Sequence, residues 1–406
     1  MREGHPIAAS DTLLVTVPSL TLPHKGEGAC RDRGEMSKAS GTDARFMALA
    51  LALGRRGLGL AWPNPAVGAV VVREADGPLI VGRGWTQVGG RPHAETEALD
   101  RAGAAARGAT LYVTLEPCSH HGKTPPCVDA IVASGIARVV SALEDPNPEV
   151  AGKGHARLIA HGIAVDIGVG ADAARRAHAG HISRVRHHRP DVTLKLALSA
   201  DGKAGLAGRK PVPITGAAAT ARVHRMRAMS DAIMIGIGTA LADDPRLTCR
   251  LPGMEAHSPV RVVLDRALRL PIASALVQSA REIPLWLIAG EAASSAREQQ
   301  FRAHGVEIVR APAAGDRLDL PSVLGLLAGR GITRLMVEGG PILAAAMVAA
   351  DLVDEAVLFH SPHLIGGSGI DALEGKPLTA LTRSTRLVLR STERLGLDTM
   401  ETFERP

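Results

Sequence analysis

Aromatic residues are scarce in this chain of 406 residues, where phenylalanine, tryptophan and tyrosine together make up 2%. Proteins that bind single-stranded nucleic acid stack bases on aromatic rings, so the scarcity argues against a nucleic-acid partner despite a net charge of +6. The four cysteines are too few for a disulfide framework, and no apolar run is long enough to cross a bilayer. We therefore expect a cytoplasmic protein with no membrane partner, whose basic balance suits a phosphorylated small molecule.

The pattern of apolar runs predicts two folded domains after an extension. Residues 1–41 are rich in glycine, serine, threonine, proline and charge without periodicity, which is typical of a disordered segment. Strand-like runs alternate with helical patterns over 42–187 and again over 188–406, which predicts α/β domains built on mostly parallel sheets. The expected strands are 67–72, 109–115, 138–142 and 164–168, then 192–198, 232–237, 260–264, 285–289, 307–309, 335–337 and 355–359.

A histidine and two cysteines stand in the order typical of zinc-dependent deaminases. His93 is followed by Glu95, by Pro117-Cys118 and, after a loop longer than the usual Cys-x-x-Cys spacing, by Cys127. One imidazole and two thiolates leave Zn²⁺ an open position for water, which makes such a site catalytic. Glu95, not itself a ligand, is suited to take a proton from that water and deliver it to a departing amine. The segment predicts hydrolytic deamination.

Prolines next to the ligands indicate where helices begin. Pro92 and Pro117 stand just before His93 and Cys118, so we expect each ligand at a helix start beside the end of a strand. The partial positive charge of a helix N-terminus would favour the thiolate at Cys118. His120, in the loop between the two cysteines, suits either a substrate phosphate or solvent. The same holds for Lys123.

Several motifs, in order, resemble the bifunctional riboflavin-biosynthesis deaminase–reductase family, RibD. They are Pro63 to Gly68, Pro92 to Glu95, Thr114 to Cys127, Leu194 to Lys203, Gly236 to Arg250 and Val337 to Pro341. The resemblance implies an N-terminal cytidine-deaminase-like three-layer α/β domain and a C-terminal dihydrofolate-reductase-like α/β domain. It also implies two steps: a pyrimidinone carrying a phosphoribosylamino group loses a ring amine, and NADPH then reduces its ribosyl group to ribityl.

The resemblance implies site residues as well. Lys195 would act near the reacting sugar of the reductase step, whereas Glu95 acts in deamination. In the expected strand, the neighbours Leu194 and Leu196 point to the face opposite Lys195. The sequence lacks a Gly-x-Gly-x-x-Gly fingerprint after a strand, so a Rossmann site is not supported. The implied substrate contacts are Asn64, Arg227, Leu247, Arg250 and Glu338. The implied NADPH contacts are Ala197, Thr239, Asp243, Gly340, Pro341, Ile342, Leu343, Ala344, Ala345 and Ala346.

Some positions depart from the family pattern. Thr86 stands where the family often has a histidine, Arg266 where a small hydroxyl residue is common, and Pro211-Val-Pro213 where Ser-x-Trp is usual. Two other hypotheses remain open. One is a nucleoside or tRNA-base deaminase with an unrelated C-terminal module, and the other is a binding protein in which zinc is only structural. We expect a homo-oligomer of unspecified size.

Overall fold

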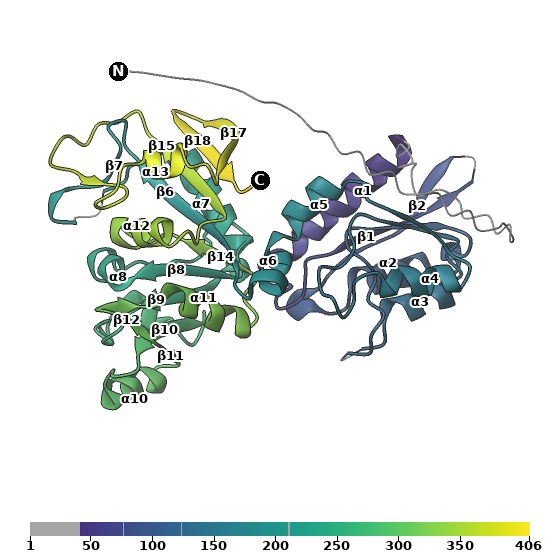
Figure 1. Ribbon diagram of the computed structural model, residues 1–406, viewed down its shortest axis with the longest axis horizontal. Coiled ribbons are helices and arrows are strands. Elements are labelled where there is room, and N and C mark those ends of the chain that lie inside the picture. The colour runs from purple at the N-terminus through teal and green to yellow at the C-terminus, as the bar shows by residue number, and fades with distance from the viewer. Residues whose placement is uncertain (1–40, 76, 123, 210–211) are drawn as a thin grey trace, which may run out of the picture. The chain divides into compact units, whose positions relative to one another are not determined.

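The computed structural model describes residues 41–406 apart from 76, 123 and 210–211 (Figure 1). Residues 1–40 of the predicted extension lie outside the described part, as do Lys123 and Pro211. Gly41, the last residue assigned to that extension, begins the first helix. Within the described residues, no helix has the length and apolar character needed to span a membrane.

The first large sheet has five strands in the order β2-β1-β3-β4-β5. β1 is antiparallel to both β2 and β3, whereas β3, β4 and β5 run parallel. The prediction of a mostly parallel sheet is therefore wrong for this half, since two of its strand pairings are antiparallel. The strands are β1 (Gly68–Glu74), β2 (Pro78–Trp85), β3 (Thr110–Val113), β4 (Arg138–Ser141) and β5 (Ala164–Ile167).

Helices cover both faces of this sheet and make three layers (Figure 1). Apolar residues of α2, α3 and α4 pack on one face in a cluster with Val71, Leu111 and Val139. Residues of α1 and α5 pack on the other face with Val70 and Val140. The helices are α1 (Gly41–Gly54), α2 (Ala94–Ala102), α3 (Cys127–Ser134), α4 (Lys153–Ala160), α5 (Ala171–Ala177) and α6 (Ala179–His187), with 3₁₀ turns η1 (Arg55–Gly57), η2 (Val88–Gly90) and η3 (Gly103–Ala106).

Strand β2 was absent from the predicted strands, because Pro78, Gly82 and Gly84 interrupt its apolar pattern. The two glycines serve the packing of α2 against β2. A Cβ at Gly82 would lie 2.1 Å from the carbonyl oxygen of Ala98, and one at Gly84 would lie 2.3 Å from that of Ala94. Glycine is therefore required where the backbone of the ligand-bearing helix touches the sheet.

The second large sheet has nine strands in the order β11-β10-β9-β8-β14-β6-β15-β18-β17. It is parallel from β11 to β15, as predicted, and ends in the antiparallel pair β18 and β17, which the sequence reading did not predict. The strands are β6 (Asp191–Leu198), β8 (Ala232–Gly236), β9 (Val260–Leu264), β10 (Leu285–Gly290), β11 (Glu307–Ala311), β14 (Arg334–Val337), β15 (Glu355–His360), β17 (Val388–Leu395) and β18 (Asp398–Glu404).

Apolar clusters line both faces of this sheet as well. Residues of α11 and α12 pack on one face, while residues of α7, α9 and α10 belong to clusters on the other. The helices are α7 (Ala217–Ala228), α8 (Ile237–Asp243), α9 (Ala275–Gln278), α10 (Ser295–Ala303), α11 (Leu320–Gly329), α12 (Pro341–Ala349) and α13 (Thr379–Thr382). The remaining elements are η4 (Ala207–Arg209), η5 (Glu255–His257) and the strand pairs β12 (Ala313–Ala314) with β13 (Arg317–Leu318) and β7 (Lys203–Gly205) with β16 (Ile370–Asp371).

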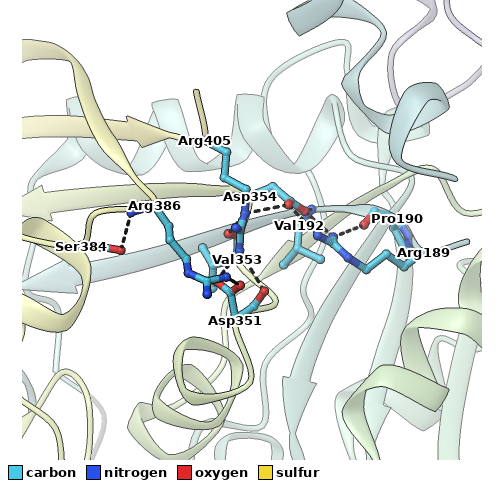
Figure 2. Close-up of polar contacts among 9 residues, drawn as sticks. All are labelled: Arg189, Pro190, Val192, Asp351, Val353, Asp354, Ser384, Arg386 and Arg405. Carbon is cyan, nitrogen blue, oxygen red and sulfur yellow. Dashed lines mark hydrogen bonds and ion pairs between the residues drawn. The ribbon is translucent and has the colours of Figure 1, made fainter. Parts of the chain in front are cut away.

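A charged network ties the start of β6 to the end of β18 (Figure 2). Asp354 accepts from Nη2 of Arg189 at 2.7 Å and from the amide of Val192 at 2.9 Å. Arg405, beyond β18, donates from Nη2 to Oδ1 of Asp351 at 2.7 Å. These bonds join segments that are far apart in the sequence. They therefore help to hold β6, in the middle of the sheet, together with β18 near its end.

Candidate active sites

The three predicted zinc ligands come from the edges of two helices and a loop. His93 caps the N-terminus of α2, and Cys127 is the first residue of α3. Cys118 lies in the loop after β3, so the expectation that it begins a helix is wrong. A helix N-terminus still favours its thiolate, because the amide of Cys127, at the start of α3, donates to Sγ of Cys118 at 3.3 Å.

The ligand atoms converge on one point. Nδ1 of His93 lies 3.2 Å from Sγ of Cys127 and 3.6 Å from Sγ of Cys118. Among the described residues, no fourth histidine, cysteine or carboxylate joins the group. Hydrogen bonding from Cys127 lowers the pKa of the Cys118 thiol to about 4, which favours the thiolate that a metal requires. One nitrogen and two sulfurs without a fourth protein ligand fit a catalytic zinc ion.

Glu95 lies in the first turn of α2, two residues beyond His93, and is 3% exposed. Burial raises the pKa of its carboxyl to about 7. A carboxyl that titrates near neutrality can both accept and release a proton during turnover. Glu95 is not a member of the group formed by His93, Cys118 and Cys127.

Asn64 lies beside the histidine ligand. Its Nδ2 donates to the carbonyl of Gly90 at 2.9 Å and lies 3.4 Å from Nε2 of His93. Thr86, at the position where a histidine was expected, is buried and accepts from the amide of Val67 at 3.0 Å, so it supports the start of β1. His120 is exposed in the loop between the cysteines, and Lys123 lies outside the described residues.

Glu116, next to Pro117 in the ligand segment, was not identified from the sequence. It is 4% exposed, and its carboxylate accepts hydrogen bonds from backbone amides of a distant segment. A Cβ at Gly154 would lie 2.1 Å from the carbonyl oxygen of Pro117, so that segment approaches the ligand loop closely. The donors are the amides of Asp145 at 3.0 Å, Gly152 at 3.0 Å, Gly154 at 2.7 Å and His155 at 3.3 Å.

A cavity of about 390 Å³ in the second half brings together seven of the predicted reductase residues. Lys195 reaches it from β6 and Glu338 from the end of β14, with Nζ of Lys195 4.0 Å from Oε2 of Glu338. Burial lowers the pKa of Lys195. The predicted residues that line the cavity are Lys195, Ala197, Thr239, Asp243, Glu338, Gly340 and Pro341.

Arg227 contacts Glu338 directly, with Nε 2.6 Å from Oε1 and Nη2 2.9 Å from Oε2. Despite burial, Arg227 holds the pKa of Glu338 below its ordinary value. Leu247 is 3% exposed, and Arg250 is exposed; neither lines the cavity. Pro213, which the sequence interpretation left out of the sites, does line it.

A second cavity of about 610 Å³ shares Gly238, Thr239 and Gly340 with the first. The amide of Gly340, the N-cap of α12, donates to Oγ1 of Thr239 at 3.0 Å and so joins α12 to α8. Of the predicted coenzyme stretch, Ile342, Leu343 and Ala346 line this second cavity. Ala344 and Ala345 are instead buried in the core and line neither cavity.

Two family models match separate parts of the chain. Residues 40–143 match the family model described as the cytidine and deoxycytidylate deaminase zinc-binding region, and residues 190–400 match the RibD C-terminal domain. The second match rules out an unrelated C-terminal module. The RibD riboflavin biosynthesis proteins of Escherichia coli K12 and Aquifex aeolicus are 40% and 38% identical, over 82% and 89% of this chain and 92% and 98% of theirs.

Solved structures give the same result. Acinetobacter baumannii RibD is 34% identical, with a TM-score of 0.79, over 90% of this chain and 99% of that one. A Thermotoga maritima diaminohydroxyphosphoribosylaminopyrimidine deaminase and 5-amino-6-(5-phosphoribosylamino)uracil reductase is 33% identical, with a TM-score of 0.77 and the same coverage. With relatives of this similarity along most of its length, the chain belongs to the RibD family of bifunctional deaminases and reductases in riboflavin biosynthesis.

Proposed function

We propose that residues 42–187 deaminate a phosphoribosylamino-pyrimidinone and that residues 188–406 reduce the ribosyl group of the product with NADPH. For the first step, the observation that carries the proposal is the convergence of His93, Cys118 and Cys127 beside the buried Glu95. For the second, it is the cavity that Lys195 and Glu338 share with the N-terminus of α12. The identity of the substrate rests on the name of the Thermotoga relative.

In the deaminase site, His93, Cys118 and Cys127 would hold zinc, which activates water for attack on the ring carbon that bears the amine. Glu95 passes one proton of the water to the ring nitrogen and the second to the amine. The carbon–nitrogen bond breaks and ammonia leaves, so the water oxygen remains on the ring. Asn64, beside His93, orients the substrate through its side-chain amide.

In the reductase site, Thr239 and Gly340 would help to hold NADPH, which would supply a hydride to the sugar carbon bonded to nitrogen. Lys195 donates a proton to the ring oxygen as the bond between that oxygen and the same carbon breaks, which opens the ribose to ribityl. Glu338 lies 4.0 Å from the lysine and accepts hydrogen bonds from sugar hydroxyls. The alternation of half-buried and buried residues along β6 turns Lys195 away from the core that Leu194 and Leu196 enter.

One experiment separates the two steps. Purified protein with zinc releases ammonia from the diamino substrate, and Glu95→Gln abolishes this release while zinc content and NADPH consumption on the deaminated intermediate persist. Glu97→Gln, on the same helix but ion-paired with Arg101, serves as the control and retains the release. Ammonia release by Glu95→Gln at the control's rate would contradict the role of Glu95. No consumption of NADPH by the wild type would contradict the coenzyme assignment.

We also propose that the protein forms a homo-oligomer. Light scattering coupled to size-exclusion chromatography tests this directly. A mass equal to that of one 42.2 kDa chain would contradict it.

A further inference from the structure

We propose that Asp201 is a positioning residue of the reductase, which holds the strand pair of β7 and β16 in place as a wall of the cavity that contains Lys195. The inference rests on the proposed reductase function and adds to it a residue that acts on ligand binding from outside the cavity. Asp201 lies in the turn between β6 and β7 and does not itself line the cavity. Its carboxylate joins this turn to the segment that precedes β16.

The pair of β7 and β16 forms part of the wall of the cavity of about 390 Å³. β7 contributes Ala204 and Gly205 to the lining, and β16 contributes Ile370. Ile370 pairs with Gly205, so the two strands move together. Lys195 lines the same cavity from β6, and a shift of the strand pair therefore changes the shape of the space that this lysine enters. The position of the pair affects how tightly a ligand is held there.

This strand pair is a two-stranded sheet of its own, separate from the nine-stranded sheet. On one side it is anchored by the core, because Ala372 and Leu373, just beyond β16, are 2% and 1% exposed. In the segment before β16, residues 362–364 and 366–368 are exposed, so burial of apolar surface does little to hold that segment. A two-stranded sheet alone is only marginally stable. Polar contacts at the start of the pair therefore determine where it lies.

The Asp201 carboxylate supplies such contacts with both of its oxygens. Oδ1 accepts from the amide of Ile365 at 3.0 Å, and Oδ2 accepts from the amide of Gly366 at 2.8 Å. The hydroxyl of Ser199, directly after β6, donates to Oδ1 at 2.7 Å and so fixes the orientation of the carboxylate. The bond from Ser199, followed by those from the two amides, lowers the pKa of Asp201 to about 2. The carboxylate is therefore ionised at neutral pH and accepts from all three donors.

Ser199 connects this carboxylate to both strands of the pair. It is 2% exposed, and its side-chain oxygen also accepts from the amide of Lys203, the first residue of β7, at 2.9 Å. Nζ of Lys203 in turn donates to Oδ1 of Asp371, in β16, at 2.7 Å. One series of contacts therefore runs from the end of β6, the strand that carries Lys195, through Asp201 and Lys203 to the wall of the cavity.

The test separates ligand binding from folding. Asp201→Ala removes the acceptor of both amides, and we expect KM for the deaminated intermediate or for NADPH, each measured with the other saturating, to rise about tenfold. kcat changes much less, and ammonia release by the deaminase is unchanged. A folding defect alone would lower kcat and leave both KM values unchanged, since the molecules that remain folded bind normally. Asp201→Asn keeps one acceptor oxygen, so its effect on KM is smaller.

Asp319→Asn is the matched control. The Asp319 carboxylate also accepts from a backbone amide, that of Ser322 at 3.0 Å, but Asp319 lines neither reductase cavity. Both KM values stay at the wild-type level in this variant.

Amide hydrogen exchange checks the contact itself. In Asp201→Ala, the peptide that contains Ile365 and Gly366 exchanges faster than in the wild type, whereas exchange in α11 is unchanged. If the wild type reduces the deaminated intermediate but Asp201→Ala keeps both wild-type KM values, whether or not exchange rises, Asp201 is not a positioning residue and the reductase function stands. If the wild type does not oxidise NADPH in the presence of the intermediate, the proposed reductase function fails and this inference fails with it.

Discussion

Arg227 and Glu338 form a two-bond fork beside the reductase cavity, with Nε 2.6 Å from Oε1 and Nη2 2.9 Å from Oε2. Both residues were expected to contact substrate, yet in this structure they bind each other. Arg227 also donates to the carbonyl of Thr248 at 3.1 Å. The arginine therefore positions the Glu338 carboxylate. That carboxylate lies 4.0 Å from Nζ of Lys195.

Replacing Arg227 with glutamine leaves the Glu338 carboxylate buried without its main partner. We expect reductase kcat/KM to fall about tenfold to a hundredfold, corresponding to about 1.5–3 kcal/mol for bonds to a charged group. Ammonia release by the deaminase stays at the wild-type rate. Arg222→Gln is the matched control, since Arg222 lies on the same helix and pairs with the half-exposed Glu393. Equal losses in the two variants would show that the fork has no special role.

The pH dependence of the reductase reports on Lys195. Burial lowers the pKa of this lysine, so its ammonium form is present below that value and is lost as the pH rises through it. We expect the rate to fall on the alkaline side at a pH below the ordinary lysine pKa of about 10.4. The nearby Glu338 carboxylate raises the pKa of Lys195, so Glu338→Gln moves the fall to still lower pH.

Variants at position 195 complete this test. Lys195→Met removes the proton donor and lowers the reductase rate by about a hundredfold or more. Lys195→Arg carries a group that stays protonated, so any remaining activity loses the alkaline fall. An alkaline limb at the same pH in the wild type and in Lys195→Arg would assign that limb to another group.

We expect Glu116 to hold the segment that carries Cys118 in place, through its hydrogen bonds to backbone amides. Glu116→Ala leaves the amides of Gly152 and Gly154 without their acceptor, and we expect the free energy of unfolding to fall by about 3 kcal/mol. Since Cys118 lies two residues further along the chain, bound zinc per chain also falls at limiting zinc concentration. Denaturant unfolding and atomic absorption measure the two effects. Glu149→Gln, which changes an exposed side chain of the same domain, is the control. Wild-type zinc content in Glu116→Ala would refute the supporting role.

Asp191 makes stability depend on pH. Burial raises the pKa of its carboxyl to about 7 in the folded protein, above the ordinary value of about 3.9. A raised folded-state pKa contributes stability below about pH 4, and this contribution is lost as the pH rises towards 7. Asp191→Asn removes the loss, so its Tm relative to the wild type is higher at pH 8 than at pH 4. Calorimetry across this range measures the difference, with the exposed Asp316→Asn as the control. A difference that does not change with pH would contradict the assignment.

The parallel strands could be predicted from the sequence because they are short β-branched runs buried on both faces. Strand β2 could not, since Gly82 and Gly84 are poor strand formers. Their value lies in the contact with Ala94 and Ala98 of α2, which only the folded structure reveals. Strand β17 was missed for another reason. Most of its side chains are exposed, so it has no buried face to impose a period of two.

The sites divide in a similar way. The zinc ligands were predictable because their types and order determine their chemistry, whatever path the chain takes between them. The fork of Arg227 and Glu338 was not, since it joins a helix to a strand end more than a hundred residues away. The same holds for Glu116, whose partners are backbone amides that no sequence pattern marks.

The position of β6 in the second sheet affects the order in which the protein can fold. β6 is the first strand of that sheet to leave the ribosome, and it carries Lys195. Its two neighbours in the sheet, β14 and β15, begin only at residues 334 and 355 and are therefore synthesised much later. During synthesis both edges of β6 therefore stay unpaired while most of its domain is translated, and this half of the protein depends on slow, long-range strand pairing.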